Sequence, residues 1–378
     1  MWFLAWREIR HSRVRFGLLA TLVALVAYLV FVMTGLAVGL GEASVSGLRH
    51  LPADQLVFAS NVQRSLDRSD LPGDLGTRLT AAGARTATPV GFSMANLAAG
   101  EDVVSVGLLG WPTTGSTAGG QPSTPAPGGA AGRAAPGWDG TGLLLDRSAA
   151  DKGLRVGQTV RVQPGGVELT VSGFADLGTY SHTPMAYVPL TTWQQIRRTP
   201  DRVSAYLIEG HVGIEGATGK KDVAGAEGKV RGVPGAEAVD LDTAITSVPS
   251  YAAETGTVNL IRSFLYAGAA LLIGTVFWIL TLQKEGSLAV LRATGARRGL
   301  LLGSYLMEVL VTLGAGVAVS AGAAFASAAL LPAGVFLLTV GDTLGAAALL
   351  TVLALLGSLV SMRRLLTVDP LLSLGRSV

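Results

Sequence analysis

The segment QKEGSLAVLRATGARRGLLLGSY, Gln283–Tyr305, separates two long apolar runs of this chain. It is basic and interrupted by glycines, which is typical of a loop that joins two membrane spans on the cytoplasmic side. A second protein can push on a loop in that position. The segment therefore predicts a membrane protein.

The composition supports a mixed membrane protein. Of the 378 residues, 49% are hydrophobic and 15% are charged, which is too apolar for an ordinary soluble domain. The net charge is +3, and the basic residues gather beside apolar runs instead of forming a surface for nucleic acid. The absence of cysteine excludes disulfides and thiolate metal sites.

Four apolar stretches are long enough to cross a bilayer. The first has 25 residues without a charge, and at about 1.5 Å per residue it exceeds a hydrocarbon core of roughly 30 Å. A cleaved signal peptide is the alternative, because four arginines precede this stretch, but its apolar region would normally have only about 7 to 15 residues. The predicted spans are residues 16–40, 260–282, 299–325 and 342–362.

Basic clusters predict the orientation of these spans. They precede the first span, lie between the second and third, and follow the fourth, so all fall on one side if the four stretches cross. The positive-inside rule places that side in the cytoplasm. We therefore expect a protein of the plasma membrane with both termini inside. The predicted cytoplasmic parts are residues 1–15, 283–298 and 363–378, and the predicted outer parts are residues 41–259 and the loop 326–341.

The large outer region is long enough for its own core. In residues 159–175, TVRV and ELTVSGF alternate apolar and polar residues around the turn PGG, which predicts a β-hairpin. Residues 112–136 are rich in Gly, Pro, Ser and Thr and predict a flexible loop. The expected fold class is a membrane α-helical protein of four transmembrane helices, with an extracytoplasmic α+β domain inserted between the first and second.

No motif for covalent chemistry is found. The nearest approach to a phosphate loop, GIEGATGKKD at Gly213–Asp222, has the wrong spacing and places Lys221 where Ser or Thr should hold magnesium. There is no Ser/His/Asp order, zinc spacing or dinucleotide fingerprint, and the four histidines show no ligand spacing. The sequence therefore predicts a protein that is not an enzyme and has no metal site of its own.

Two glycines at the outer end of the first span, Gly35 and Gly39, form a GxxxG pattern in TGLAVGL. Small residues at that spacing let two membrane helices approach closely, so these glycines are candidates for a contact between two copies of the chain. Glycine is also common in membrane helices that make no such contact.

The loop and the chain end together resemble the FtsX/MacB-type (type VII) permeases of ABC transporters. The loop of that family typically reads E-I-x-V-L-R-A-x-G; here Leu288 stands at the Ile position, and Ser287 replaces the usual Glu. The positions Val290, Leu291, Arg292, Ala293 and Gly295 match outright, and Asp369, Pro370 and Leu374 match the closing DP-x-x-x-L. Within the family, FVMTGLAVGLG, GTYSHTPMAYV and PSYAAETGTVNLI are similar to the HrtB-type heme exporters.

This resemblance implies a pump made of two permease copies and two cytoplasmic ABC ATPase subunits. ATP and Mg²⁺ would bind the partner ATPase, so the permease would hold no cofactor, and heme would be its transported substrate. The resemblance places the ATPase contact in the loop, although a simple basic turn is the alternative. The predicted ATPase-coupling residues are Leu288, Val290, Leu291, Arg292, Ala293, Gly295 and Arg297.

Heme iron needs an axial ligand, and His, Met and Tyr are the types available in a chain without Cys. The candidates are polar or Met side chains predicted near the outer membrane surface, with Tyr251, Tyr180 and Met33 placed first. Each could equally be structural, since a Tyr at a membrane boundary is usually an anchor. The full set of heme-binding candidates is Tyr251, Tyr180, Met33, Glu42, His182 and Glu254.

Two other functions remain open within the same family. An FtsX-like mechanotransmitter would move no substrate and would use ATPase strokes to activate an external hydrolase. A MacB- or Lol-like pump would export a peptide, a lipoprotein or another amphipathic substrate. A groove for a protein partner would favour the mechanotransmitter, whereas convergent Tyr, Met and Glu side chains would favour heme export.

Overall fold

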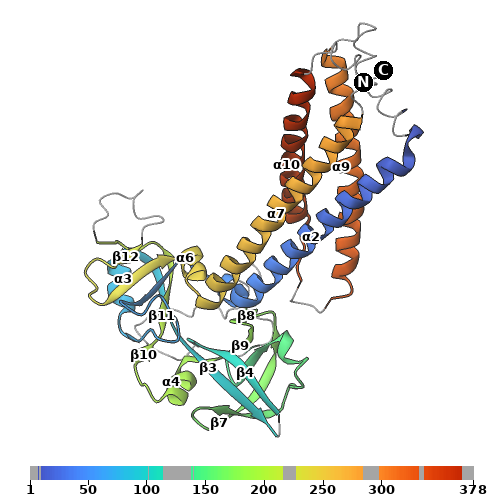
Figure 1. Cartoon of the computed structure of the whole chain (residues 1–378). Helices are drawn as coiled ribbons and strands as arrows, with labels where there is room; N and C mark the ends of the chain where they lie inside the picture. Colours follow the sequence, from blue (N-terminus) through green and yellow to red (C-terminus); the bar gives the residue numbers. More distant parts are fainter. Residues whose placement is uncertain are drawn as a thin grey trace, which may run out of the picture. The chain divides into compact units, whose positions relative to one another are not determined.

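The computed structural model describes residues 7, 10–100, 102–113, 138, 140–215, 227–283, 298–331 and 336–367. The chain forms two compact units. One contains Met1–Leu40 and Thr255–Val378 and is called the helical unit below; the other, Gly41–Glu254, is called the domain. The predicted fold class is confirmed, because four long apolar helices flank a β-rich domain that is inserted between the first and the second (Figure 1).

In the described part of the chain, four helices are long and apolar enough to cross a membrane. They extend beyond the predicted apolar spans, since the polar turns at their ends continue the same backbone hydrogen bonding. The helices are α2 (Arg13–Arg49), α7 (Pro249–Gln283), α9 (Arg298–Ala328) and α10 (Val340–Thr367).

Two apolar clusters hold the helical unit together. Both draw residues from all four helices, with Phe31, Ile273 and Val309 among those that are at most 3% exposed. Polar contacts join neighbouring helices: Thr281 of α7 donates to the Tyr305 hydroxyl of α9 at 2.8 Å, and Tyr305 donates to the Phe277 carbonyl at 3.2 Å. These hydroxyls are satisfied inside the unit, as polar groups away from water require.

Within its described residues, the domain is built on a sheet of eleven strands. Its strands are β1 (Gln55–Ala59), β3 (Ala84–Ala99), β4 (Asp102–Trp111), β5 (Leu143–Asp146), β6 (Thr159–Gln163), β7 (Val167–Ala175), β8 (Thr179–Tyr180), β9 (Thr183–Pro189), β11 (Ala205–Gly210), β12 (Gly228–Lys229) and β13 (Ala236–Asp240). A separate pair joins β2 (Leu71–Pro72) to β10 (Arg202–Val203). The short helices are α3 (Gly76–Ala81), η1 (Arg147–Ala149), α4 (Leu190–Arg197) and α6 (Leu241–Thr246).

Part of this sheet closes on itself. The pairings run β3-β4-β9-β5-β7-β6, and β6 pairs again with β3 through Asn96↔Gln163, Leu97↔Val162 and Ala98↔Arg161, which completes a barrel. The first half of β3 instead pairs with β11, and the sheet continues through β1 and β13 to β12. The predicted hairpin is confirmed as β6–β7, with Thr159 opposite Thr170, whereas the sequence did not indicate the closure.

A tryptophan of α4 fastens that helix to the sheet. Gly91 of β3 and Gly110 of β4 lie opposite each other, and the Trp193 side chain lies over this glycine pair. A Cβ atom added at Gly91 would lie 2.2 Å from the Trp193 ring. Trp193 is 4% exposed, and its Nε1 donates to the Ser93 hydroxyl at 3.1 Å.

Candidate functional site

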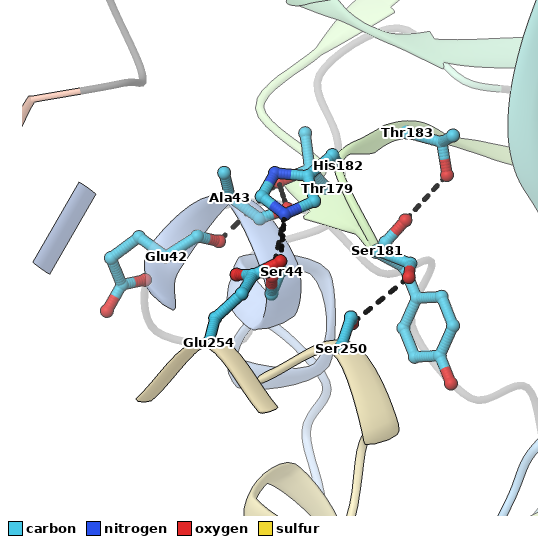
Figure 2. A network of polar contacts seen from close by, with 10 residues as sticks. Glu42, Ala43, Ser44, Thr179, Ser181, His182, Thr183, Ser250 and Glu254 are labelled. Carbon is cyan, nitrogen blue, oxygen red and sulfur yellow. Dashed lines mark hydrogen bonds and ion pairs between the residues drawn. The ribbon is translucent and has the colours of Figure 1, made fainter. Parts of the chain in front are cut away.

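Three segments of the domain meet at the ends of the two helices that enter it. They are the last turns of α2 (Gly41–Arg49), the first turns of α7 (Pro249–Glu254) and the turn around β8 (Leu177–Thr183). Figure 2 shows the polar side chains that join these segments. We call this arrangement the clamp, because its contacts fasten the β8 turn to both helix ends.

Backbone contacts fix the β8 turn against α2. The amides of Ser181 and His182 donate to the carbonyls of Ser44 and Ala43 at 2.9 and 3.0 Å. Both donors have left-handed backbone conformations, with φ of +50° and +63°. Such conformations are unfavourable for residues other than glycine, so contacts around the turn must hold them. The turn is therefore shaped by its docking on the helix.

Side chains complete the joint to α2. Ser46 Oγ lies 3.0 Å from Thr179 Oγ1 and accepts a hydrogen bond from the Thr179 amide at 2.9 Å. Thr179 Oγ1 in turn donates to the Ala43 carbonyl at 2.7 Å. Each polar group at this contact is paired, as burial demands.

The carboxylate of Glu254 joins the start of α7 to the end of α2 and to the β8 turn (Figure 2). Glu254 Oε1 lies 2.6 Å from His182 Nε2, and Glu254 Oε2 accepts from Ser44 Oγ at 2.9 Å. Ser44 is fully buried, whereas the side chains of His182 and Glu254 are 41% and 29% exposed. A second link joins Ser181 Oγ to Ser250 Oγ at 3.0 Å. One carboxylate thus bonds both to the turn and to α2.

Glycines and a buried aspartate permit this close approach. Gly178 has φ +77°, and a Cβ atom there would lie 2.7 Å from the Gly47 amide nitrogen and 2.8 Å from the Ser46 carbonyl carbon. Asp146, 5% exposed, accepts from the amides of Leu177 and Gly178 at 2.9 and 2.8 Å. The Asp146 carboxylate holds the backbone of the β8 turn. Because Gly178 has no side chain, this backbone can lie close against α2.

Two tyrosines proposed as ligands have different surroundings. Tyr180 is 7% exposed, and its ring lies edge-on to Phe92 with centroids 4.6 Å apart. Burial, with a smaller contribution from Asp67, raises the pKa of Tyr180 to about 12, so it is a neutral phenol at physiological pH. Tyr251 of α7 is only partly buried, and its ring packs beside Gly41.

The acidic and basic candidates are engaged in polar contacts within the domain. Glu42 is paired with Arg49 at 3.3 Å, both on α2. Glu254 and His182 belong to the clamp, so the structure brings together these two of the six heme candidates. Among the described residues, no three His, Cys, Asp or Glu side chains gather as they would to hold a metal ion.

The other predicted residues lie in the helical unit or outside the described part of the chain. Met33 is partly buried on α2. Gly35 faces Phe336 of the same chain, 2.5 Å from an added Cβ atom, and Gly39 is buried, so the interchain contact at these glycines stays a prediction. The coupling residues Leu288, Val290, Leu291, Arg292, Ala293, Gly295 and Arg297 fall in 284–297, outside the described residues, as do most of the Gly/Pro-rich segment and the closing DP motif.

Sequence reasoning missed Ser44, Ser46, Thr179 and Asp146. Small polar residues carry no distinctive pattern, and Asp146 looks like an ordinary turn residue after an apolar strand. The sequence signal for these contacts was limited to small residues in two separate stretches. Ser46 and Gly47 follow an apolar helix, Gly178 and Thr179 flank a short turn, and only the fold brings these two stretches into contact.

We expect Glu254→Ala to lower the free energy of unfolding of the domain by about 1–2 kcal/mol, since it removes the acceptor for the buried Ser44 hydroxyl and for His182. Denaturant titration of the full chain, followed by tryptophan fluorescence, would measure this. Glu168→Ala is the control, because its pair with Arg161 is more than half exposed and should contribute less than about 1 kcal/mol. Equal losses in the two variants would contradict a structural role for the clamp.

Comparison with known proteins gives similarity over the whole chain. Residues 259–370 match the family described as FtsX-like permease C-terminal. The chain is 22% identical to the "Putative hemin transport system permease protein HrtB" of Staphylococcus haemolyticus, over 98% of this chain and 99% of that protein. A Staphylococcus epidermidis protein of the same name is 20% identical, with the same coverage.

Solved structures are also similar to part of the chain. One of them is the extracellular domain of the noncanonic ABC-type transporter YknZ from Gram-positive bacteria. The alignment covers 42% of this chain and 82% of that one, at 14% identity and a TM-score of 0.28.

Proposed function

We infer from the FtsX-like permease domain at residues 259–370, which the sequence resemblance predicted, that this membrane protein is the permease subunit of an ABC efflux pump. We propose that its cargo is heme. The observation that carries this proposal is the alignment of relatives named for hemin transport over 98% of the chain, across helices and domain alike.

The proposed pump draws its energy from a partner. A cytoplasmic ATPase, in two copies, would bind ATP and Mg²⁺ and push on two copies of this permease. The contact would lie in the basic loop, with Leu288, Leu291 and Arg292 as its apolar and charged parts. In this arrangement residues 1–15, 283–298 and 363–378 face the cytoplasm, and the domain lies outside, as the distribution of Lys and Arg favours.

The clamp supports a role for the domain in the cycle. Because it fastens the β8 turn to residues 41–49 of α2 and 249–254 of α7, a displacement of either helix end must either move the turn or break its hydrogen bonds. Closely packed protein segments have low compressibility and transmit strain. The β8 turn and the two helix ends should therefore move together as one body. The same property would suit an FtsX-like mechanotransmitter, so binding of the cargo must separate the two functions.

For heme ligation we place Tyr251 and Met33 ahead of Tyr180. An iron-bound tyrosine is a phenolate, and the raised pKa of Tyr180 makes that form costly in its buried setting. His182 and Glu254 bond to each other, so either would have to leave the clamp in order to bind iron. Tyr251, which is only partly buried, needs no such rearrangement.

Titration of the purified full chain with hemin, read as the shift of the Soret band, tests the cargo. We expect Tyr251→Phe and Met33→Ala each to weaken hemin binding about tenfold or more through loss of an axial ligand. Tyr180→Phe is the matched control and should change binding by less than about threefold, a difference of under 1 kcal/mol. The absence of a Soret shift in the unmodified chain would overturn the heme assignment and favour the mechanotransmitter.

Growth under excess hemin tests transport. Cells that carry the permease and its ATPase should tolerate more hemin than cells that lack either. Substitution of Leu291 by Asp should abolish this advantage without changing the Soret titration, because it would place a charge in the apolar ATPase contact while leaving the outer site intact.

A further inference from the structure

One face of α7 points into the helical bundle. Its buried residues recur at intervals of three or four, which is the spacing of a single helix face. Those with apolar side chains are Ala269, Ile273, Phe277 and Leu280, each at most 5% exposed. Leu265 and Tyr266, one turn earlier, pack against the apolar cluster that includes Ala27 and Phe31 of α2.

Arg262 continues this buried face. It lies seven residues before Ala269 and four before Tyr266, so it occupies the next position on the same stripe. Its side chain is half-buried, and its Nε is fully shielded without a hydrogen-bond partner. Among the residues that the structure describes, none forms a hydrogen bond or an ion pair with Arg262. Within the described part of the chain, this permanent positive charge therefore has no carboxylate within ion-pairing distance.

This arrangement is energetically costly. A charged side chain costs roughly 2.5 kcal/mol at the centre of a membrane helix on insertion scales, and less near an end such as the predicted outer end of this span, where Arg262 lies. Charged residues that face a bundle interior commonly serve a ligand or an ion pathway. Arginine presents several N–H donors in a plane that matches the two oxygens of a carboxylate. We therefore propose that Arg262 is an oxyanion-binding site, and that its ligand is a carboxylate of the amphipathic cargo.

A lipid phosphate is the competing source of an oxyanion. A lipid would reach the outward face of α7, but that face is apolar at this level: Leu260, Ile261 and Phe264 are 60%, 45% and 71% exposed. Arg262 lies on the opposite, bundle-facing side, which favours a ligand held among the helices. The assignment to cargo rests on the proposed function, because heme has two propionate carboxylates on an otherwise apolar ring.

Hemin and hemin dimethyl ester, titrated into the full chain in nanodiscs of phosphatidylcholine, test the proposal. The ester retains the iron and ring but lacks the carboxylates. We expect the unmodified chain to bind hemin about tenfold more tightly than the ester, which corresponds to one charge-assisted hydrogen-bonded pair. Arg262→Gln should remove that preference by weakening hemin binding alone, and Arg262→Lys should restore part of it.

Controls separate the possible outcomes. Ser263→Ala changes an exposed neighbour on the same turn and should leave both affinities unchanged. If hemin and its ester bind equally to the unmodified chain, or if Arg262→Gln keeps the preference, the inference is wrong while heme binding stands. If neither compound binds, the proposed function itself fails. If Arg262→Gln instead releases phosphatidylglycerol that co-purifies with the unmodified chain, the ligand is a lipid phosphate and the assignment to cargo is overturned.

Discussion

Replacement of Trp193 by alanine should destabilise the domain by about 3–5 kcal/mol, the cost of removing a large aromatic side chain from a core. Trp193 is 4% exposed and fills the space that Gly91 and Gly110 leave free above β3 and β4. Its loss would also leave the buried Ser93 hydroxyl without the indole donor. Denaturant unfolding of the full chain, monitored by circular dichroism, would measure the change.

A substitution on the sheet side of this contact, at Gly91, tests the packing of Trp193 independently. Gly91→Val should destabilise the domain by about 1–3 kcal/mol or more, because any Cβ at this position would overlap the Trp193 ring. Val103→Ala, at an exposed position of β4 (61%), is the control and should cost less than about 0.5 kcal/mol. Wild-type stability in Trp193→Ala would mean that α4 is not fastened to the sheet in this way.

Substitution of Gly178 by alanine should abolish most hemin tolerance while the domain remains folded. The new Cβ would overlap Gly47 and Ser46 at the end of α2, so the β8 turn could not dock and the clamp would open. Gly166→Ala is a close control: its φ is +72° against +77° for Gly178, and nothing lies within 4 Å of its added Cβ.

Comparison of Gly178→Ala with Gly166→Ala separates the effect of the steric clash with α2 from the effect of the left-handed backbone conformation. Both should lose roughly 1 kcal/mol of stability from the left-handed conformation alone, and only Gly178→Ala should lose hemin tolerance. Growth under hemin and limited proteolysis of the domain would be measured together. Equal tolerance in the two variants would contradict a role for the clamp in transport.

The helices could be predicted from the sequence because each carries its own signal. A long uncharged run such as Phe16–Leu40 needs no partner to be recognised. The β6–β7 hairpin was predictable for the same reason, since the turn and both alternating strands lie within residues 159–175. Closure of the barrel was not, because it depends on the pairing of Leu97 with Val162, more than sixty positions apart.

In the candidate site, too, features that are local in the sequence could be predicted, whereas contacts between distant segments could not. Tyr180, His182 and Glu254 were predicted as heme candidates from their side-chain types, but chemical type alone does not reveal burial or pairing. The structure places Tyr180 in the core and His182 against Glu254. Ser44 and Gly178, which make the clamp possible, are ordinary residues in sequence and gain their role only from contacts between distant segments.

The strand order of the domain also sets the order in which it can be completed during synthesis. The β3–β4 hairpin can form as soon as Trp111 has emerged, since its partners are neighbours in the chain. β1 must wait much longer: it lies between β11 and β13, so its last partner is not available until Asp240. Both edges of β1 are unpaired until β11 begins at Ala205, and one edge stays unpaired until β13 is complete. It is therefore the segment that a chaperone would need to protect during synthesis.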